Sequence, residues 1–258
     1  MEIIEYYKGI YDSAKEGLKE SYQFIKEKKG NIPYIYDAVE SDQKSLGILE
    51  YCYKNNIIES KKSFYKSTLA REWIYDAYEK KEYKIDTNDV STYAYESLFN
   101  AVLSGSRERA IYMANLFGGR VEEEKDDFLL NVLLGYGLKY VILDEKEKAY
   151  EYINKLEENK DKRGMKQYYN GYGRVYKGII DRNEEEVNEV LKFMIKNHKT
   201  RMKKNGYTLE QYFAYDSIAL AMIAKERRLN INVVNELLPM EYLEPTNINY
   251  NEIYLFEE

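Results

Sequence analysis

Cysteine, histidine, tryptophan and proline are all rare in this chain of 258 residues, which has one Cys, one His, one Trp and three Pro. The single cysteine, Cys52, cannot form an intrachain disulfide, which favours a reducing compartment. One histidine and one cysteine cannot supply the clustered ligands of a structural zinc site, so we expect no bound metal. The prolines are Pro33, Pro239 and Pro245, and the long interval between the first two permits uninterrupted helices.

Several signatures of catalysis are also absent. The sequence has no HExxH, GxxxxGK(S/T) or GxGxxG motif, and we expect no cofactor. The one histidine, His198, lies on an apolar helical stripe between Met194 and Met202, so a structural ring is favoured over a general base. We therefore predict that the chain is not an enzyme. An α-helical hydrolase that uses paired acids remains an open alternative, because carboxylates are plentiful.

Long apolar runs are missing as well. No segment approaches the ~18 to 20 apolar residues of a membrane span, and the opening MEIIEYYKGI lacks the basic and apolar regions of a signal peptide. With 45 acidic against 39 basic residues, the formal net charge is −6, which disfavours nucleic acid as a partner. We predict a soluble cytoplasmic protein that binds neither membrane nor nucleic acid, and a basic protein is the favoured kind of partner.

The chain is rich in tyrosine, with 29 residues, and in helical periodicity. Tyrosine suits half-buried helix surfaces, because its ring is apolar and its hydroxyl needs a partner. No period-2 alternation is sustained between residues 34 and 238, which argues against strands. We predict one all-α domain over 1–258, with irregular N-terminal helices in 1–85, stacked helix pairs in 89–238 and a short extended tail in 239–258.

A repeat is visible in the middle of the chain. The stretches VLSGSRERAIYMANLF, ILDEKEKAYEYINKL and IDRNEEEVNEVLKFM each have the pattern of a turn followed by a helix, and each follows another apolar-periodic stretch. Their aligned apolar positions are Ala110, Ala149 and Val187; Ala114, Ile153 and Leu191; and Phe117, Leu156 and Met194. The unit recurs about every 38 residues, near the period of tetratricopeptide-like arrays. Since one helix pair cannot bury its apolar face alone, we predict a right-handed solenoid of αα-hairpins.

The stretch AYDSIALAMIAKERRL, residues 214–229, carries four alanines in an otherwise bulky chain. Small residues let a helix approach its neighbours closely on several sides, so we predict the inner helix of a terminal pair, with Leu209 and Phe213 on one of its faces. Asp216 interrupts that face, and it either meets a tyrosine hydroxyl or a helix N-terminus, or lines a binding surface. Residues 230–238 are expected to form a last helix that Pro239 ends, and the tail after it either docks as an extended arm or frays.

The segments DSIALAMIAKERRL and ELLPMEYLE, with the short link between them, resemble bacterial immunity proteins of polymorphic toxin systems, most of all the immunity protein 49 family. The resemblance covers about 30 residues, and Arg228 stands where that family tends to have glycine. It implies a small cytoplasmic protein that binds a cognate toxin domain stoichiometrically and blocks it. It supplies no catalytic residues.

The resulting hypothesis is a toxin-neutralising protein that occludes a basic cleft of its partner with tyrosines and acids. The predicted contact residues are Tyr168, Tyr172, Tyr176, Glu122, Glu123 and Glu124. The alternative hypothesis is a helical-repeat regulator or scaffold that binds a peptide in its concave groove. The oligomeric state stays open at this point.

Overall fold

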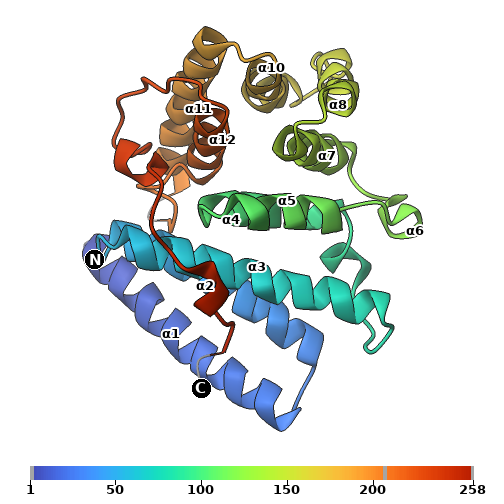
Figure 1. Ribbon diagram of the computed structural model, residues 1–258, viewed down its shortest axis with the longest axis vertical. Helices are drawn as coiled ribbons and strands as arrows, with labels where there is room; N and C mark the ends of the chain where they lie inside the picture. Colours follow the sequence, from blue (N-terminus) through green and yellow to red (C-terminus); the bar gives the residue numbers. More distant parts are fainter. Residues whose placement is uncertain (1–2, 206–207, 257–258) are drawn as a thin grey trace.

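The computed structural model describes residues 3–205 and 208–256, and within them the regular structure is entirely helical, which confirms the all-α prediction (Figure 1). The only β-type pairing in these ranges is an isolated bridge between Asn235 and Leu238. None of the helices described there has the length and apolar character that a membrane crossing requires.

Three long helices build the N-terminal third: α1 (Ile3–Glu27), α2 (Ile32–Cys52) and α3 (Ile57–Glu79), with α2 packed against both others. This part is more regular than we predicted from the sequence. Its pattern is obscured because α3 buries polar side chains among the apolar ones. Lys61, for example, is buried and donates to the carbonyl oxygen of Glu244 at 2.8 Å, while Arg71 pairs with Glu40 and Asp37.

The next part of the chain forms the three helix pairs that the sequence predicts. They are α4 (Glu96–Leu103) with α5 (Arg107–Leu116), α7 (Leu129–Leu143) with α8 (Lys146–Glu158), and α10 (Arg174–Ile180) with α11 (Glu184–Asn205). The short elements between them are η1 (Thr87–Asp89), η2 (Thr92–Tyr95), α6 (Val121–Glu124), α9 (Lys166–Tyr168) and the π-helical η3 (Tyr169–Gly173). All nine aligned apolar positions of the predicted repeat are buried.

The turns within the three pairs share one backbone feature. Each contains a residue in the left-handed region, namely Gly105 (φ 76°), Asp144 (φ 59°) and Arg182 (φ 58°). A left-handed residue after a helix ends it and redirects the chain, so each pair folds back on itself at an equivalent position. The pairs also contact one another, since α7 packs on α4 and α5, and α10 packs on α7 and α8.

The alanine-rich helix, α12 (Tyr215–Glu226), contacts α4 of the first pair and both α10 and α11 of the third. Every residue from Ser217 to Ala224 is buried, as expected for a helix with neighbours on several sides. Its start differs from our expectation: Leu209 and Phe213 both precede the helix, Leu209 in a turn and Phe213 in the irregular stretch just before it.

The predicted last helix over 230–238 is wrong, because these residues are extended or in turns. Their backbone bonds to α11 instead. The carbonyl oxygen of Asn230 and the N–H of Asn232 both bond to the side chain of Asn188 at 2.8 Å, and the N–H of Asn230 donates to Glu184. These side-chain partners replace the hydrogen bonds that a helix would have formed.

The tail docks along the N-terminal helices through η4 (Met240–Leu243) and η5 (Tyr250–Glu252). Tyr242 is fully buried and donates to the carbonyl oxygen of Leu103 at 3.3 Å. Tyr250 donates to the carbonyl oxygen of Ser104 at 2.6 Å, and the ring of Phe256 contacts Tyr22 at 4.8 Å. The end of the chain therefore covers its beginning, as Figure 1 shows.

Two helix glycines provide a matched test of this packing. A Cβ added at Gly9 in α1 meets no atom within 4 Å, whereas one at Gly135 in α7 lies 2.6 Å from Cζ of Phe117. Gly9→Ala should raise the free energy of unfolding by about 0.5–1 kcal/mol, because alanine is the better helix former. Gly135→Ala should lower it by about 1–3 kcal/mol through overpacking. Urea denaturation measures both, and equal stabilisation by the two changes contradicts the close contact at Gly135.

Candidate partner-binding surface

The three tyrosines predicted as contacts follow one another along α9, η3 and α10, but the structure exposes them unequally. Tyr168 and Tyr172 are half-buried, and their rings are 6.5 Å apart. Tyr176 is fully buried and donates to the carbonyl oxygen of Leu134 at 3.2 Å. Tyr176 is therefore a core residue that joins α10 to α7, and it offers no surface to a partner.

Asp216 has the tyrosine partner that was one of its two predicted roles. The hydroxyl of Tyr172 donates to Oδ2 of Asp216 at 2.5 Å, and Oδ1 accepts from the backbone N–H of Ser217 at 2.7 Å. Burial and the negative charge of Asp216 together raise the pKa of Tyr172 well above its ordinary value. The tyrosine thus stays protonated and donating, and the carboxylate stabilises the first turn of α12.

His198 is buried on α11 and held by two contacts. Its Nε2 lies 2.9 Å from the carbonyl oxygen of Glu210, and a carbonyl only accepts, so Nε2 carries the proton. In the neutral ring Nδ1 is then the acceptor, and it faces the Arg201 guanidinium at 3.4 Å. Burial lowers the pKa of His198. The contacts are those of a neutral ring that positions the segment after α11.

These side chains line a cavity of about 400 Å³ between η3, α11 and the start of α12, with Tyr168, Asn197 and Arg201 at its edge. The polar atoms of Asp216 and His198 already have partners within the protein. Asp216 accepts from Tyr172 and Ser217, and His198 bonds to the carbonyl oxygen of Glu210. The cavity brings together Tyr168 and Tyr172 with the two residues whose roles the sequence left open. The three predicted glutamates are not among its lining residues.

The predicted glutamates lie on α6, which is well separated in Figure 1 from α10, the helix that the predicted tyrosines lead into. Glu123 accepts from the hydroxyl of Tyr78, and Glu124 accepts from Tyr136 at 2.7 Å and from the backbone N–H of Arg120 at 3.0 Å. Both side chains therefore hold α6 in place. Glu122 is different: its side chain is 83% exposed and its one ion pair is a 3.6 Å contact with Lys125.

Exposed apolar side chains precede and follow Glu122 in the chain. Val121 is 76% exposed and Phe128 is 70% exposed, and the exposed ring of Tyr93 lies 6.1 Å from that of Phe128. We call this surface the α6 patch and define it as Tyr93, Val121, Glu122, Phe128 and Leu129. Large apolar groups gathered in one exposed region are typical of a site that another molecule covers.

Side-chain contacts fix the residues around the α6 patch to neighbouring elements. Asp127 accepts from the backbone N–H of Thr92 at 2.8 Å and from its hydroxyl, which ties the segment after α6 to η2. Arg120 lies over the ring of Tyr75 at 4.7 Å and donates to Glu79 at 3.0 Å. The patch is therefore presented on a rigid surface, which lowers the entropy cost of binding.

Val121 and Phe128 were missed as surface residues in the sequence, because Phe128 opens an apolar-periodic stretch that otherwise marks a core helix. The usable signal was the place of Phe128 at the edge of the acidic run, before the start of α7.

Among the residues described, no group of three or more Asp, Glu, His or Cys is arranged to hold a metal ion. Comparison of the chain with protein-family models, with curated proteins and with solved structures finds no match.

The bond between Tyr172 and Asp216 predicts a specific stability loss. Tyr172→Phe keeps the ring and removes the donor, so the free energy of unfolding should fall by about 1–3 kcal/mol, because a covered carboxylate oxygen loses its partner. Tyr168→Phe is the matched control, since the Tyr168 hydroxyl has no hydrogen-bond partner among the residues described. Chemical denaturation of both variants checks this, and losses of the same size would refute the role given to the bond.

His198 predicts a dependence of stability on pH. Its folded-state pKa lies below the ordinary value of about 6.5, so the unfolded chain takes up the proton first, and the ring's contribution to stability is lost as pH falls below that value. His198→Gln keeps an N–H donor and does not titrate. The free energy of unfolding should therefore fall less between neutral and mildly acidic pH in the variant than in the parent protein. If the free energy of unfolding falls equally with pH in the two proteins, the role assigned to His198 is wrong.

Proposed function

We propose that this chain is an immunity protein that binds a cognate toxin domain in the cytoplasm and neutralises it by steric occlusion, without catalysis. The observation that carries the proposal is the α6 patch, in which exposed Val121 and Phe128 lie before and after the exposed carboxylate of Glu122 in the chain. The resemblance of residues 216–244 to the immunity protein 49 family supports the same function.

The proposed partner presents a basic surface with apolar side chains within it. Burying an exposed valine or phenylalanine contributes about 1.5–3 kcal/mol each, which suits Val121 and Phe128 as anchors at the centre of an interface. Glu122 and the net charge of −6 then favour approach by a positively charged face. A substrate-binding cleft of a nuclease or another enzyme that acts on polyanions has that character.

We further propose that the three helix pairs form a right-handed tetratricopeptide-like array. The equivalent left-handed turns and the contacts between successive pairs support it. The inner row of such an array would be α4, α7 and α10, and α12 packs against α4 and α10. In such an array α12 of the same chain would occupy the groove that a peptide-binding regulator needs, which favours the immunity function over the regulator alternative.

Co-expression with the product of an adjoining toxin gene tests the proposal. The parent chain should restore growth and co-purify with that product as a complex of defined stoichiometry. Val121→Asp should weaken the complex about tenfold or more, because it places a desolvated charge against the partner's apolar surface. The variant's own fold should tolerate the change, since an acid in the first turn of α6 suits the helix N-terminus.

Val234→Asp is the matched control, because Val234 is 94% exposed and lies in the segment between α12 and η4, far along the chain from α6. It should leave the affinity unchanged. Rescue without any complex, or no rescue at all, is evidence against the immunity function. A complex weakened equally by Val121→Asp and Val234→Asp would keep the function and reject the α6 patch as its site.

A further inference from the structure

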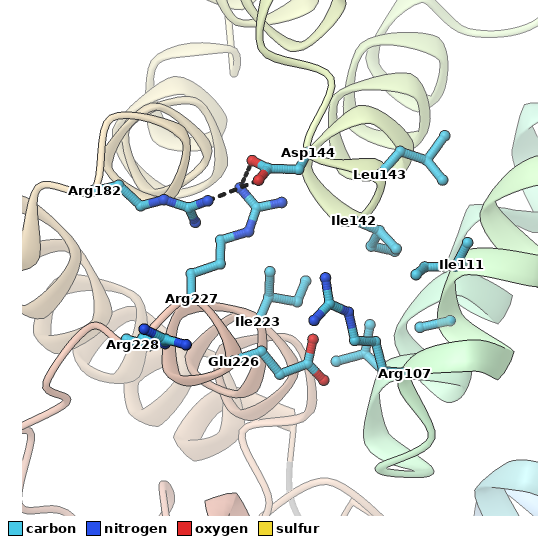
Figure 2. A pocket seen from close by; sticks show the side chains of 12 residues that line it. Arg107, Ile111, Ile142, Leu143, Asp144, Arg182, Ile223, Glu226, Arg227 and Arg228 are labelled. Carbon is cyan, nitrogen blue, oxygen red and sulfur yellow. Dashed lines mark hydrogen bonds and ion pairs between the residues drawn. The ribbon is translucent and has the colours of Figure 1, made fainter.

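A second hollow lies at the edge of the molecule where the helix-pair turns meet. It has a volume of about 280 Å³ and is lined by residues at or next to helix ends: Val102 of α4, Arg107 and Ile111 of α5, Ile142 and Asp144 at the end of α7, Arg182 of the turn before α11, and Glu226 to Arg228 at the end of α12. Figure 2 shows these side chains converging from all sides of the opening. No lining residue belongs to the α6 patch.

The charge of this hollow is strongly one-sided. Four guanidinium groups, those of Arg107, Arg182, Arg227 and Arg228, face only two carboxylates, those of Asp144 and Glu226. The lining therefore carries an excess of two positive charges, although the whole chain carries a net charge of −6. A local excess of positive charge in a partly enclosed site concentrates anions.

The two carboxylates do not neutralise the arginines evenly. Asp144 pairs with two of the arginines. Its Oδ1 accepts from Arg227 at 2.6 Å and its Oδ2 accepts from Arg182 at 2.7 Å (Figure 2). Within the described residues, the side chains of Arg107 and Arg228 make no hydrogen bond and no ion pair closer than 4 Å, although the charge of Arg107 acts on Glu226. Donors thus remain available on two sides of the hollow.

Arg227 is the most constrained of the four. Its side chain is only 8% exposed, and it also donates to the carbonyl oxygen of Val141. Burial lowers its pKa to about 10, Asp144 opposes this change, and the nearby cations Arg182 and Arg107 reinforce it. The charged guanidinium of Arg227 is thus buried beside two other cations, and both its burial and these cations disfavour its charged form. A second anion in the hollow would stabilise that charged form.

We propose that this hollow binds a dianionic phosphate group, either inorganic phosphate or the phosphate of a small monoester. Guanidinium forks match phosphate oxygens in a bidentate way, and arginine is the preferred residue for planar recognition of this kind. The excess of two positive charges equals the charge of such a group. The volume accommodates a phosphate with a short organic substituent, and the opening at the turn edge leaves room for that substituent.

Isothermal titration of the full chain with inorganic phosphate and with glycerol 3-phosphate, at constant ionic strength, tests the site. Saturable binding is expected, with a thermal unfolding midpoint that rises with ligand concentration. Arg107→Gln and Arg182→Gln should each weaken binding about tenfold, since each removes a charge-assisted contact. The tighter of the two ligands identifies the source of the phosphate, and tight binding of either one supports the site.

Asp144→Asn separates this proposal from a purely structural role of the cluster. Asparagine tolerates the left-handed conformation at this position (φ 59°), and the change removes the negative charge that pairs with Arg182 and Arg227, so the net charge of the hollow rises by one. It should tighten phosphate binding, whereas a structural role predicts a less stable protein with unchanged binding. Arg163→Gln, at an exposed arginine outside the hollow, is the control and should have no effect. The proposal is overturned by the absence of saturable binding at millimolar phosphate, or by binding that Arg107→Gln, Arg182→Gln and Arg163→Gln leave equally unchanged.

Discussion

The arrangement of this protein depends on one helix that is covered on every side. α12 contacts α4 near the middle of the chain and α10 and α11 nearer its end, so its side chains must fit between three neighbours at once. Helix axes pack at about 8–10 Å only when the side chains between them are small, and Ala219, Ala221 and Ala224 meet that condition. Larger residues at these positions would push the first helix pair away from the third. The first and third pairs therefore take their relative positions from the small face of α12.

Tyrosine hydroxyls connect parts of the chain that are distant in sequence. Tyr242 and Tyr250 of the tail donate to the carbonyl oxygens of Leu103 and Ser104 at the end of α4. Tyr215 at the start of α12 donates to the carbonyl oxygen of Glu96 at 2.9 Å, at the other end of the same helix. Each ring buries a large apolar area. The hydroxyls of Tyr242 and Tyr250 give partners to carbonyl oxygens at the C-terminal end of α4, where a helix leaves its last carbonyls without intrahelical partners. The abundance of tyrosine in the sequence thus has a structural use at many buried positions, and only a few tyrosines remain for a partner.

The sequence predicted what depends on local pattern and missed what depends on distant partners. The helix pairs were found because each turn recurs in the same register with the buried stripe that follows it. The segment 230–238 was mistaken for a helix because its apolar spacing is helical, while the Asn188 side chain that holds it extended lies on α11. Among the proposed contacts, Tyr176 followed its neighbours in spacing yet faces the core, since a π-helical turn in η3 alters the helical phase just before it. The arginine hollow draws on residues 107, 144, 182 and 227, and no linear motif joins them.

The two ends of α12 carry opposite charges, each matched to a different neighbour. Asp216 lies in its first turn and accepts from Tyr172, while Arg227 follows its last residue and donates to Asp144. Both placements suit the helix dipole, so the polar groups at the two ends stabilise the helix as well as its contacts. The α6 patch shares no residue with either end, and α6 itself is held by Tyr78 and Tyr136 rather than by α12. The proposed partner binding at the α6 patch and the proposed anion binding at the turn edge would therefore depend on separate sets of side chains. A change in one set leaves the interactions described for the other in place, so mutation should separate the two proposed activities.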